Sequence, residues 1–152
     1  MAVYVVCGPP GSGKTTYVTG RKRTGDLVVD LDALFVALSG EAWYDKSSNL
    51  LPVVLDIRDW IVESIPGWNK AARFYNAWVI TSNPETRHRL ARKLGAKEVV
   101  VIETSYHECL ARIANDERRR KYLDHWTPLV QKWWDKYDPD PADTVIAGGK
   151  TR

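Results

Sequence analysis

The sequence predicts an α/β fold in one domain, built on a parallel sheet of five strands. Two observations predict it: five short apolar runs alternate with segments of helical character, and 152 residues with 44% hydrophobic content suit one core. The middle runs are rich in Val, Ile and Leu, as strands buried on both faces should be. The expected strands are Ala2–Cys7, Leu27–Leu31, Ala77–Thr81, Glu98–Glu103 and Thr144–Ala147.

Helices are expected between these strands, where polar residues interrupt the apolar pattern. Gly20, Gly40 and Gly95 stand where helix C-caps belong, and Asn83-Pro84-Glu85 is typical of a helix start with Pro in the first turn. Residues 40–49 and 66–70 read as loops. The expected helices cover residues 14–20, 32–39, 50–64, 84–94, 105–124 and about 128–137.

The composition of the chain indicates its cellular compartment and the kinds of partner that it could bind. The net charge of +3 permits a polyanionic partner without requiring one. The two cysteines, Cys7 and Cys109, lack metal-ligand spacing and are expected to be buried free thiols. No apolar stretch approaches the roughly 18 residues of a membrane span. We expect a cytoplasmic protein without a membrane partner, with residues 1–147 forming the domain and 148–152 a flexible basic tail.

A glycine-rich octet between the first strand and the first helix is the most informative motif. Residues 8–15 match G-x-x-x-x-G-K-[ST] without a mismatch. Glycines allow consecutive backbone N–H groups to surround a phosphate, and the following helix directs its positive end at the same anion. The expected nucleotide-binding residues are Gly8, Pro9, Pro10, Gly11, Ser12, Gly13, Lys14, Thr15 and Thr16.

Two side chains of this motif carry specific chemistry. Lys14 is placed to reach the β- and γ-phosphates of a nucleoside triphosphate such as ATP. The Thr15 hydroxyl is the expected Mg²⁺ ligand. The motif therefore predicts ATP and Mg²⁺ as the bound groups.

An acidic pair follows the second strand. Parallel strands place their carboxyl ends at one edge of the sheet, so Asp30 and Asp32 should lie near the glycine-rich octet, on one face if both remain extended. Asp32 is a candidate base for the proton of an attacking hydroxyl. The alternative is that Asp32 only caps the helix at 33–39.

The third strand ends in Thr81-Ser82-Asn83, without an acid. P-loop ATPases commonly place an Asp there, which holds Mg²⁺ and polarises the attacking water. Its absence favours phosphoryl transfer to a bound acceptor over hydrolysis.

Basic residues cluster after the fourth strand. In one continuous helix, Arg112 and Arg119 would share a face, where their guanidinium groups could neutralise a transferring phosphoryl group. The alternative is a solvated helix face, paired with neighbouring acids. The basic helix at 84–94 could steer a nucleotide or oligonucleotide acceptor, or its basic residues could form the solvated side of an amphipathic helix.

Together these pieces resemble the P-loop kinase group that includes polynucleotide 5′-hydroxyl kinases, zeta-type toxins and related small-molecule kinases. The resemblance implies the kinase-type strand order 2-3-1-4-5. It also implies that Asp32 is the base and that Arg112 and Arg119 are lid arginines on the ATP phosphates. The segments that carry it are Gly8–Thr15, Val28–Asp32, Val79–Arg87, Val99–Ile102 and Cys109–Arg112.

The chain departs from that group at two positions. Phe35 stands where an arginine usually follows the acid by three residues, and Asp116 stands where the second lid arginine is usual. The leading hypothesis is an ATP-dependent kinase acting on a hydroxyl or phosphate of a nucleotide, nucleoside or polynucleotide. The alternative is a P-loop ATPase or nucleotide switch that acts on nucleic acid or a protein.

Overall fold

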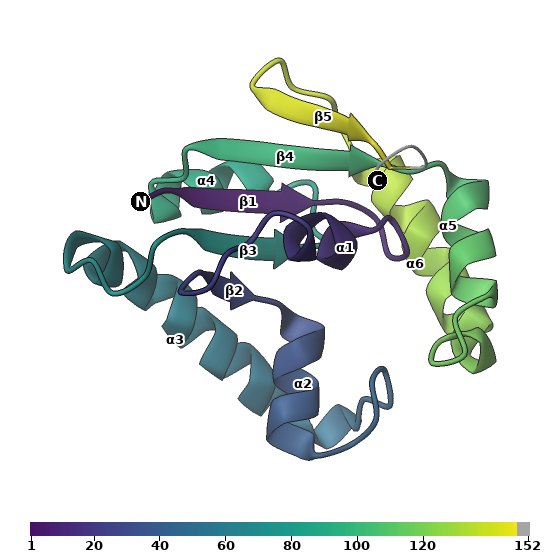
Figure 1. Ribbon diagram of the computed structural model, residues 1–152. Coiled ribbons are helices and arrows are strands. Elements are labelled where there is room, and N and C mark those ends of the chain that lie inside the picture. The colour runs from purple at the N-terminus through teal and green to yellow at the C-terminus, as the bar shows by residue number, and fades with distance from the viewer. Residues whose placement is uncertain (149–152) are drawn as a thin grey trace.

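The computed structural model describes residues 1–148 and places five parallel strands in one sheet. The strand order is β2-β3-β1-β4-β5, which confirms the expected order. All five strands run in the same direction, so their carboxyl ends meet at one edge, on the right in Figure 1. The strands are β1 (Val3–Cys7), β2 (Leu27–Val29), β3 (Ala77–Thr81), β4 (Glu98–Glu103) and β5 (Asp143–Ala147).

Six α-helices surround the sheet within the described residues, together with the 3₁₀ turns Ser48–Leu50 and Arg120–Tyr122. The short helix α1 lies alone in front of the sheet in Figure 1, whereas α4 lies behind it and α5 and α6 stand at the carboxyl edge. The helices are α1 (Lys14–Thr19), α2 (Leu31–Ser39), α3 (Leu51–Lys70), α4 (Arg87–Leu94), α5 (Tyr106–Ala114) and α6 (Leu123–Lys136).

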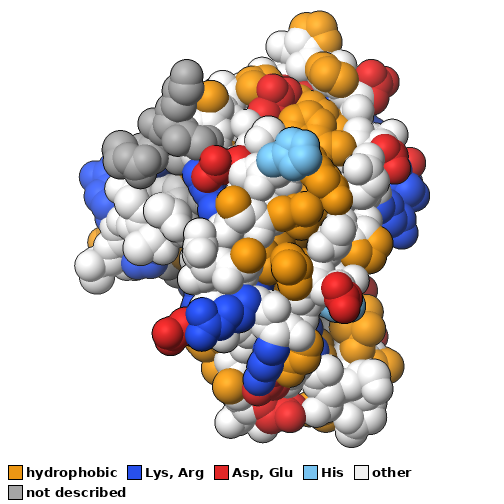
Figure 2. Space-filling model, turned by 90° about the vertical axis from the view of Figure 1, so that its right-hand side faces the viewer, with side chains coloured by type: hydrophobic (Ala, Val, Ile, Leu, Met, Phe, Trp, Pro, Cys, Tyr) orange, Lys and Arg blue, Asp and Glu red, His pale blue; other side chains and the backbone are white. Residues whose placement is uncertain are grey.

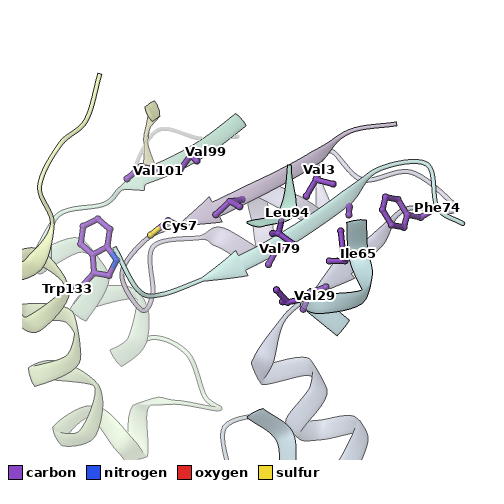
Figure 3. Close-up of a cluster of buried hydrophobic side chains, with 13 residues drawn as sticks. Val3, Cys7, Val29, Ile65, Phe74, Val79, Leu94, Val99, Val101 and Trp133 are labelled. Atoms are coloured by element: carbon purple, nitrogen blue, oxygen red, sulfur yellow. The ribbon is translucent and has the colours of Figure 1, made fainter. Parts of the chain in front are cut away.

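The main core fills the layer between the sheet and helices α3, α4 and α6 (Figure 3). Strand residues such as Val5 and Val79 meet Ile65 of α3, Leu94 of α4 and Trp133 of α6, all at most 2% exposed. The opposite sheet face packs Val6 and its neighbours against α1. Both cysteines are buried free thiols, as expected, and burial raises the pKa of each to about 11.

Several helix boundaries differ from the predicted ones. The expected helix at 105–124 ends at Ala114, and a turn with Asp116 separates it from α6. Residues 66–70 were predicted as a loop but belong to α3, and α6 begins five residues before Pro128. Burial of Ile65 in α3, and of Trp126 and Val130 in α6, outweighs the poor helix propensity of the two prolines.

The start of α4 also differs from its prediction. The helix begins at Arg87 rather than at residue 84, because the Asn83 side chain accepts a hydrogen bond from the Glu85 N–H and holds a turn there. No helix within residues 1–148 is long and apolar enough to cross a membrane. The predicted basic tail lies outside the described residues from position 149 onward.

A buried ion pair fixes the edge strand β5 to α4. The Arg87 guanidinium donates to both carboxylate oxygens of Asp143, at 3.0 and 2.7 Å, and Arg87 is 4% exposed. Burial alone would raise the pKa of Asp143, but the hydrogen bonds from Arg87 lower it below its usual value. Arg87 therefore has a structural role and does not belong to the solvated face predicted for this helix.

We predict that Arg87→Met lowers the free energy of unfolding by about 3 kcal/mol, because it removes both arginine hydrogen bonds from the buried Asp143 carboxylate and leaves it only His88 and the Asp140 N–H. Arg89→Met, on the exposed side of the same helix, should change it by about 0.5 kcal/mol or less. Urea denaturation of both variants measures the difference. Equal midpoints would contradict the structural role of the ion pair.

Candidate active site

The loop Gly8–Gly13 connects β1 to α1 at the carboxyl edge of the sheet. Gly11 and Gly13 have φ values of +77° and +97°, which side chains disfavour, and the Ser12 N–H donates to the Pro9 carbonyl at 3.0 Å. The buried Ser12 hydroxyl has no hydrogen-bond partner within the described residues. The loop is thus a curved backbone segment with a free polar atom in it.

Helix α5 holds the loop from behind. A Cβ on Gly11 would lie 2.9 Å from the Cys109 carbonyl oxygen, and one on Gly13 would lie 3.1 Å from Arg112 Nη1. The Ser12 carbonyl accepts from Arg112 Nη1 and from Thr104 Oγ1, both at 2.9 Å. Because carbonyl and N–H point in opposite directions across a trans peptide, these two bonds direct the Gly13 N–H away from α5.

Lys14 lies inside the curve of the loop. Its ammonium donates to the Gly8 and Pro9 carbonyls, each at 2.9 Å. Burial lowers the pKa of Lys14, while nearby acidic groups oppose the shift. A phosphate bound in the loop would restore a counter-charge to this ammonium, so the residues fit a nucleotide phosphate.

Two acids with different surroundings follow β2. Asp30 caps α2: its Oδ1 accepts from the Asp32 N–H at 3.0 Å, and its Oδ2 accepts from the Thr15 hydroxyl at 3.3 Å. Burial and the charge of Asp32 raise the pKa of Asp30, against the hydrogen bonds that it accepts. Asp32 lies in the first turn of α2 and forms an ion pair with Lys46.

These positions correct two sequence expectations. Asp30 and Asp32 do not share the face of an extended strand, because β2 ends at Val29 and the helix begins at once. The helix cap is Asp30 rather than Asp32, since Asp32 donates its N–H to the cap instead. The Asp32 carboxylate is consequently available to line the cleft.

A cluster of rings and cations joins two loops above the site. Arg119 lies over Tyr44 and Trp126, with distances of 4.8 and 5.9 Å to the ring centres, and donates to Asp116 at 3.0 Å. Tyr44 meets Trp126 edge to face at 5.6 Å. The loop after α2 and the turn before α6 therefore act as one packed unit.

Arg112 lies on α5, whereas Arg119 lies in the turn that follows, because the helix between them is broken. The Arg112 guanidinium donates to Ser12 and to the Gly148 carbonyl, and pairs with Glu108. Arg119 follows the turn at Asp116. Both line the cleft, and their contact with a phosphate stays a prediction.

One open cleft with a volume of about 1380 Å³ is lined by residues 10–16 of the glycine-rich loop and α1, and by Asp30, Asp32, Tyr44, Lys46, Arg112, Arg119 and Trp126. The cleft runs from the glycine-rich loop across the ends of β2 and β3 to helices α3, α4 and α6. No group of three or more His, Cys, Asp or Glu side chains suited to a metal exists within residues 1–148. Mg²⁺ needs fewer protein ligands when phosphate supplies the others, so Thr15 and Asp30 are a sufficient donor set.

The structure brings most predicted site residues together. Pro10 to Thr16 line the cleft, as do Asp32, Arg112 and Arg119. The sequence analysis missed Tyr44 and Lys46, which stood in a predicted loop without a motif. Trp126 also lines the cleft, but it is 8% exposed and packs against Tyr44.

Comparisons with known proteins address the fold. No family model and no curated protein sequence matches this chain. Solved structures do: a sugar kinase from Janibacter sp. has 18% identity and a TM-score of 0.58 over 97% of this chain and 84% of its own. The protein APE1195 has 20% identity and a TM-score of 0.59, over 99% and 87%.

The tunicamycin resistance protein of Deinococcus radiodurans is a third neighbour, with 13% identity and a TM-score of 0.56 over 100% of this chain and 88% of its own. The chain shares with these proteins a fold built on a parallel five-stranded sheet of order 2-3-1-4-5 flanked by helices. At these identities, the likeness is one of fold.

Gly11→Ala tests the contact between loop and α5. We expect it to lower the free energy of unfolding by about 1–3 kcal/mol, because Ala disfavours a φ of +77° and its methyl would press on the Cys109 carbonyl. Gly67→Ala is the control: that glycine lies within α3 with open space around it and should gain up to about 1 kcal/mol. Thermal and urea denaturation report both changes. Tolerance of Ala at both sites would refute the contact.

Asp116 provides a pH test of the turn at residues 115–119, which contains Arg118 and Arg119 and which we call the arginine turn. Burial would raise its pKa, but hydrogen bonds from Arg118 and the charge of Arg119 lower it to about 2. Because the folded value lies below the unfolded one, this stabilisation is complete above about pH 4 and is lost as the pH falls toward 2. Asp116→Asn should lower stability by about 1–2 kcal/mol at pH 7 and flatten the stability curve between pH 4 and 2. An unchanged curve would exclude this ion-pair role.

Proposed function

We propose that this protein is an ATP-dependent phosphotransferase that moves the γ-phosphoryl group to a hydroxyl or phosphate of a nucleotide, nucleoside or polynucleotide. One observation carries the proposal: the glycine-rich loop with Lys14 and the carboxylate of Asp32 border the same cleft. The kinase-like fold of the structural neighbours agrees with it.

The loop and the first turn of α1 would bind the triphosphate. Backbone N–H groups at the helix start and the Lys14 ammonium neutralise the β- and γ-phosphates. Thr15 and Asp30, whose side chains already touch, would hold Mg²⁺, which draws charge from the transferring phosphoryl group.

Asp32 is the proposed base for a hydroxyl acceptor. Its carboxylate takes the proton, the acceptor oxygen forms a bond to the γ-phosphorus, and the bond to the β,γ-bridging oxygen breaks to leave ADP. The Lys46 ammonium holds the carboxylate at the cleft wall. Arg119, fixed by Asp116 and Tyr44, would supply positive charge above the phosphates.

The end of β3 favours transfer over hydrolysis. Thr81, Ser82 and Asn83 line the cleft without a carboxylate that could polarise water. The Thr81 hydroxyl and the Asn83 amide oxygen are occupied by backbone N–H groups of the turn that follows. An ATPase or nucleotide switch is the second candidate. The kinase and the ATPase differ in whether a bound acceptor or water receives the phosphoryl group.

The decisive measurement is transfer of labelled γ-phosphate from ATP and Mg²⁺ to 5′-hydroxyl DNA and RNA oligonucleotides, nucleosides and nucleoside monophosphates. We expect label in one acceptor class. Asp32→Asn should reduce transfer at least 100-fold while ATP affinity stays within about threefold, because a positioned base contributes about 10²–10⁴. Lys14→Ala should abolish both phosphoryl transfer and ATP binding.

Arg92→Gln is the control for these variants, since Arg92 is exposed on α4 and lies outside the cleft lining. Release of labelled phosphate to water with every acceptor unlabelled would replace the kinase proposal with the ATPase. Loss of ATP binding in Asp32→Asn would instead assign Asp32 a structural or metal-binding role.

A further inference from the structure

The cleft concentrates positive charge. Ten Lys or Arg side chains and four Asp or Glu side chains line it, an excess of six positive charges, whereas the whole chain has an excess of three. The rest of the chain is therefore net negative. A triphosphate partly neutralised by Mg²⁺ accounts for the cations beside the loop, but other cations lie elsewhere in the cleft.

We call this second group the basic half of the cleft. Its members come from helices α3, α4 and α6, and none belongs to the glycine-rich loop or the arginine turn. They are Arg58, Arg89, Lys93, Lys132 and Lys136, accompanied by the acids Asp59 and Glu85.

Two members of the basic half have no counter-charge. Lys93 pairs with Glu63, and Lys136 pairs with Glu85 at 3.1 Å. For the side chains of Arg89 and Lys132, in contrast, residues 1–148 provide no hydrogen bond or ion pair. Both are exposed, and both line the cleft. They are cations available to a ligand.

The same three helices also provide an apolar surface. Leu55 of α3, Leu90 of α4 and Leu129 of α6 line the cleft together with these cations, and Leu129 lies one helical turn before Lys132. Ligand sites typically combine such apolar walls with a few charged groups that fix orientation. A sugar or base on the apolar wall would bring an attached phosphate to the two cations.

The charge is confined rather than spread over the surface at the carboxyl edge. Figure 2 views the molecule from that side: hydrophobic side chains form a band along the middle, and basic side chains lie beside acidic ones at its margins. The described residues on this face therefore form no continuous basic patch of the kind that binds nucleic acid through many phosphates. Recognition of a phosphate inside the cleft fits the distribution better.

We propose that the acceptor carries a phosphate group of its own, in addition to the group that is phosphorylated, and that Arg89 and Lys132 bind it. The inference rests on the proposed function and specifies its substrate class. A phosphorylated sugar, a nucleoside monophosphate and the first phosphate of an oligonucleotide all share this chemistry.

Matched ligands test the inference by binding, independently of turnover. The fluorescence of the cleft tryptophans is measured while each ligand is added in a separate titration. The two matched pairs are ribose and ribose 5-phosphate, and thymidine and thymidine 3′-monophosphate. Mg²⁺ and a non-hydrolysable ATP analogue are present throughout. A 5′-hydroxyl oligothymidylate distinguishes a polymer from a monomer. We expect the phosphorylated member of at least one pair to bind tenfold tighter or more, with an affinity that falls as salt rises.

The double variant Arg89→Gln/Lys132→Gln should remove most of this preference and leave affinity for the ATP analogue within twofold. Arg92→Gln/Lys97→Gln removes the same charge at exposed residues outside the cleft lining and should retain the preference. The inference is overturned if no phosphorylated ligand outcompetes its neutral partner, or if both double variants weaken binding equally.

Labelled transfer in the same samples separates the two proposals. Transfer to neutral acceptors as fast as to phosphorylated ones would leave the kinase standing and overturn the inference about its acceptor. Tight binding of a phosphorylated ligand, with all label released to water, would overturn the kinase and with it the acceptor role of this site.

Discussion

The contact between α5 and the glycine-rich loop is the constraint on which the site depends. The Ser12 carbonyl points toward α5 because Arg112 and Thr104 both donate to it. Gly11 and Gly13 lie too close to α5 for a Cβ to fit without a shift. The loop has its shape because a helix nearly a hundred residues later in the chain presses against it, so the motif alone does not determine the geometry.

A second set of long-range contacts lies along the lining of the cleft. Asp32 pairs with Lys46, whose ammonium lies 5.5 Å from the ring centre of Trp126, and that ring lies near Arg119. This sequence of charged and aromatic contacts connects the start of α2 to the turn before α6. The groups that line the cleft beside Asp32 are therefore also the groups that contact the turn before α6.

The sequence predicted the strands because their signals are local, and the resemblance to the P-loop kinase group implied their order. Five apolar runs marked the strands, and residues 8–15 identified the loop. The prediction failed where tertiary packing outweighed local preference, as at Pro66 and Pro128, which lie within helices that bury Ile65 and Trp126. It also missed Lys46, because its contacts with Asp32 and Trp126 leave no pattern in a sequence.

The two acids after β2 lie only two residues apart but have different surroundings. Asp30 is 8% exposed, caps the helix and touches Thr15, so its oxygens are directed at the backbone and the loop. Asp32, two residues later, lies on the first turn of the helix with its carboxylate at the cleft. The early end of β2 creates this division, because a strand continued to residue 32 would have placed both carboxylates on one face. The different surroundings of the two carboxylates thus follow from a single change of backbone conformation at Leu31.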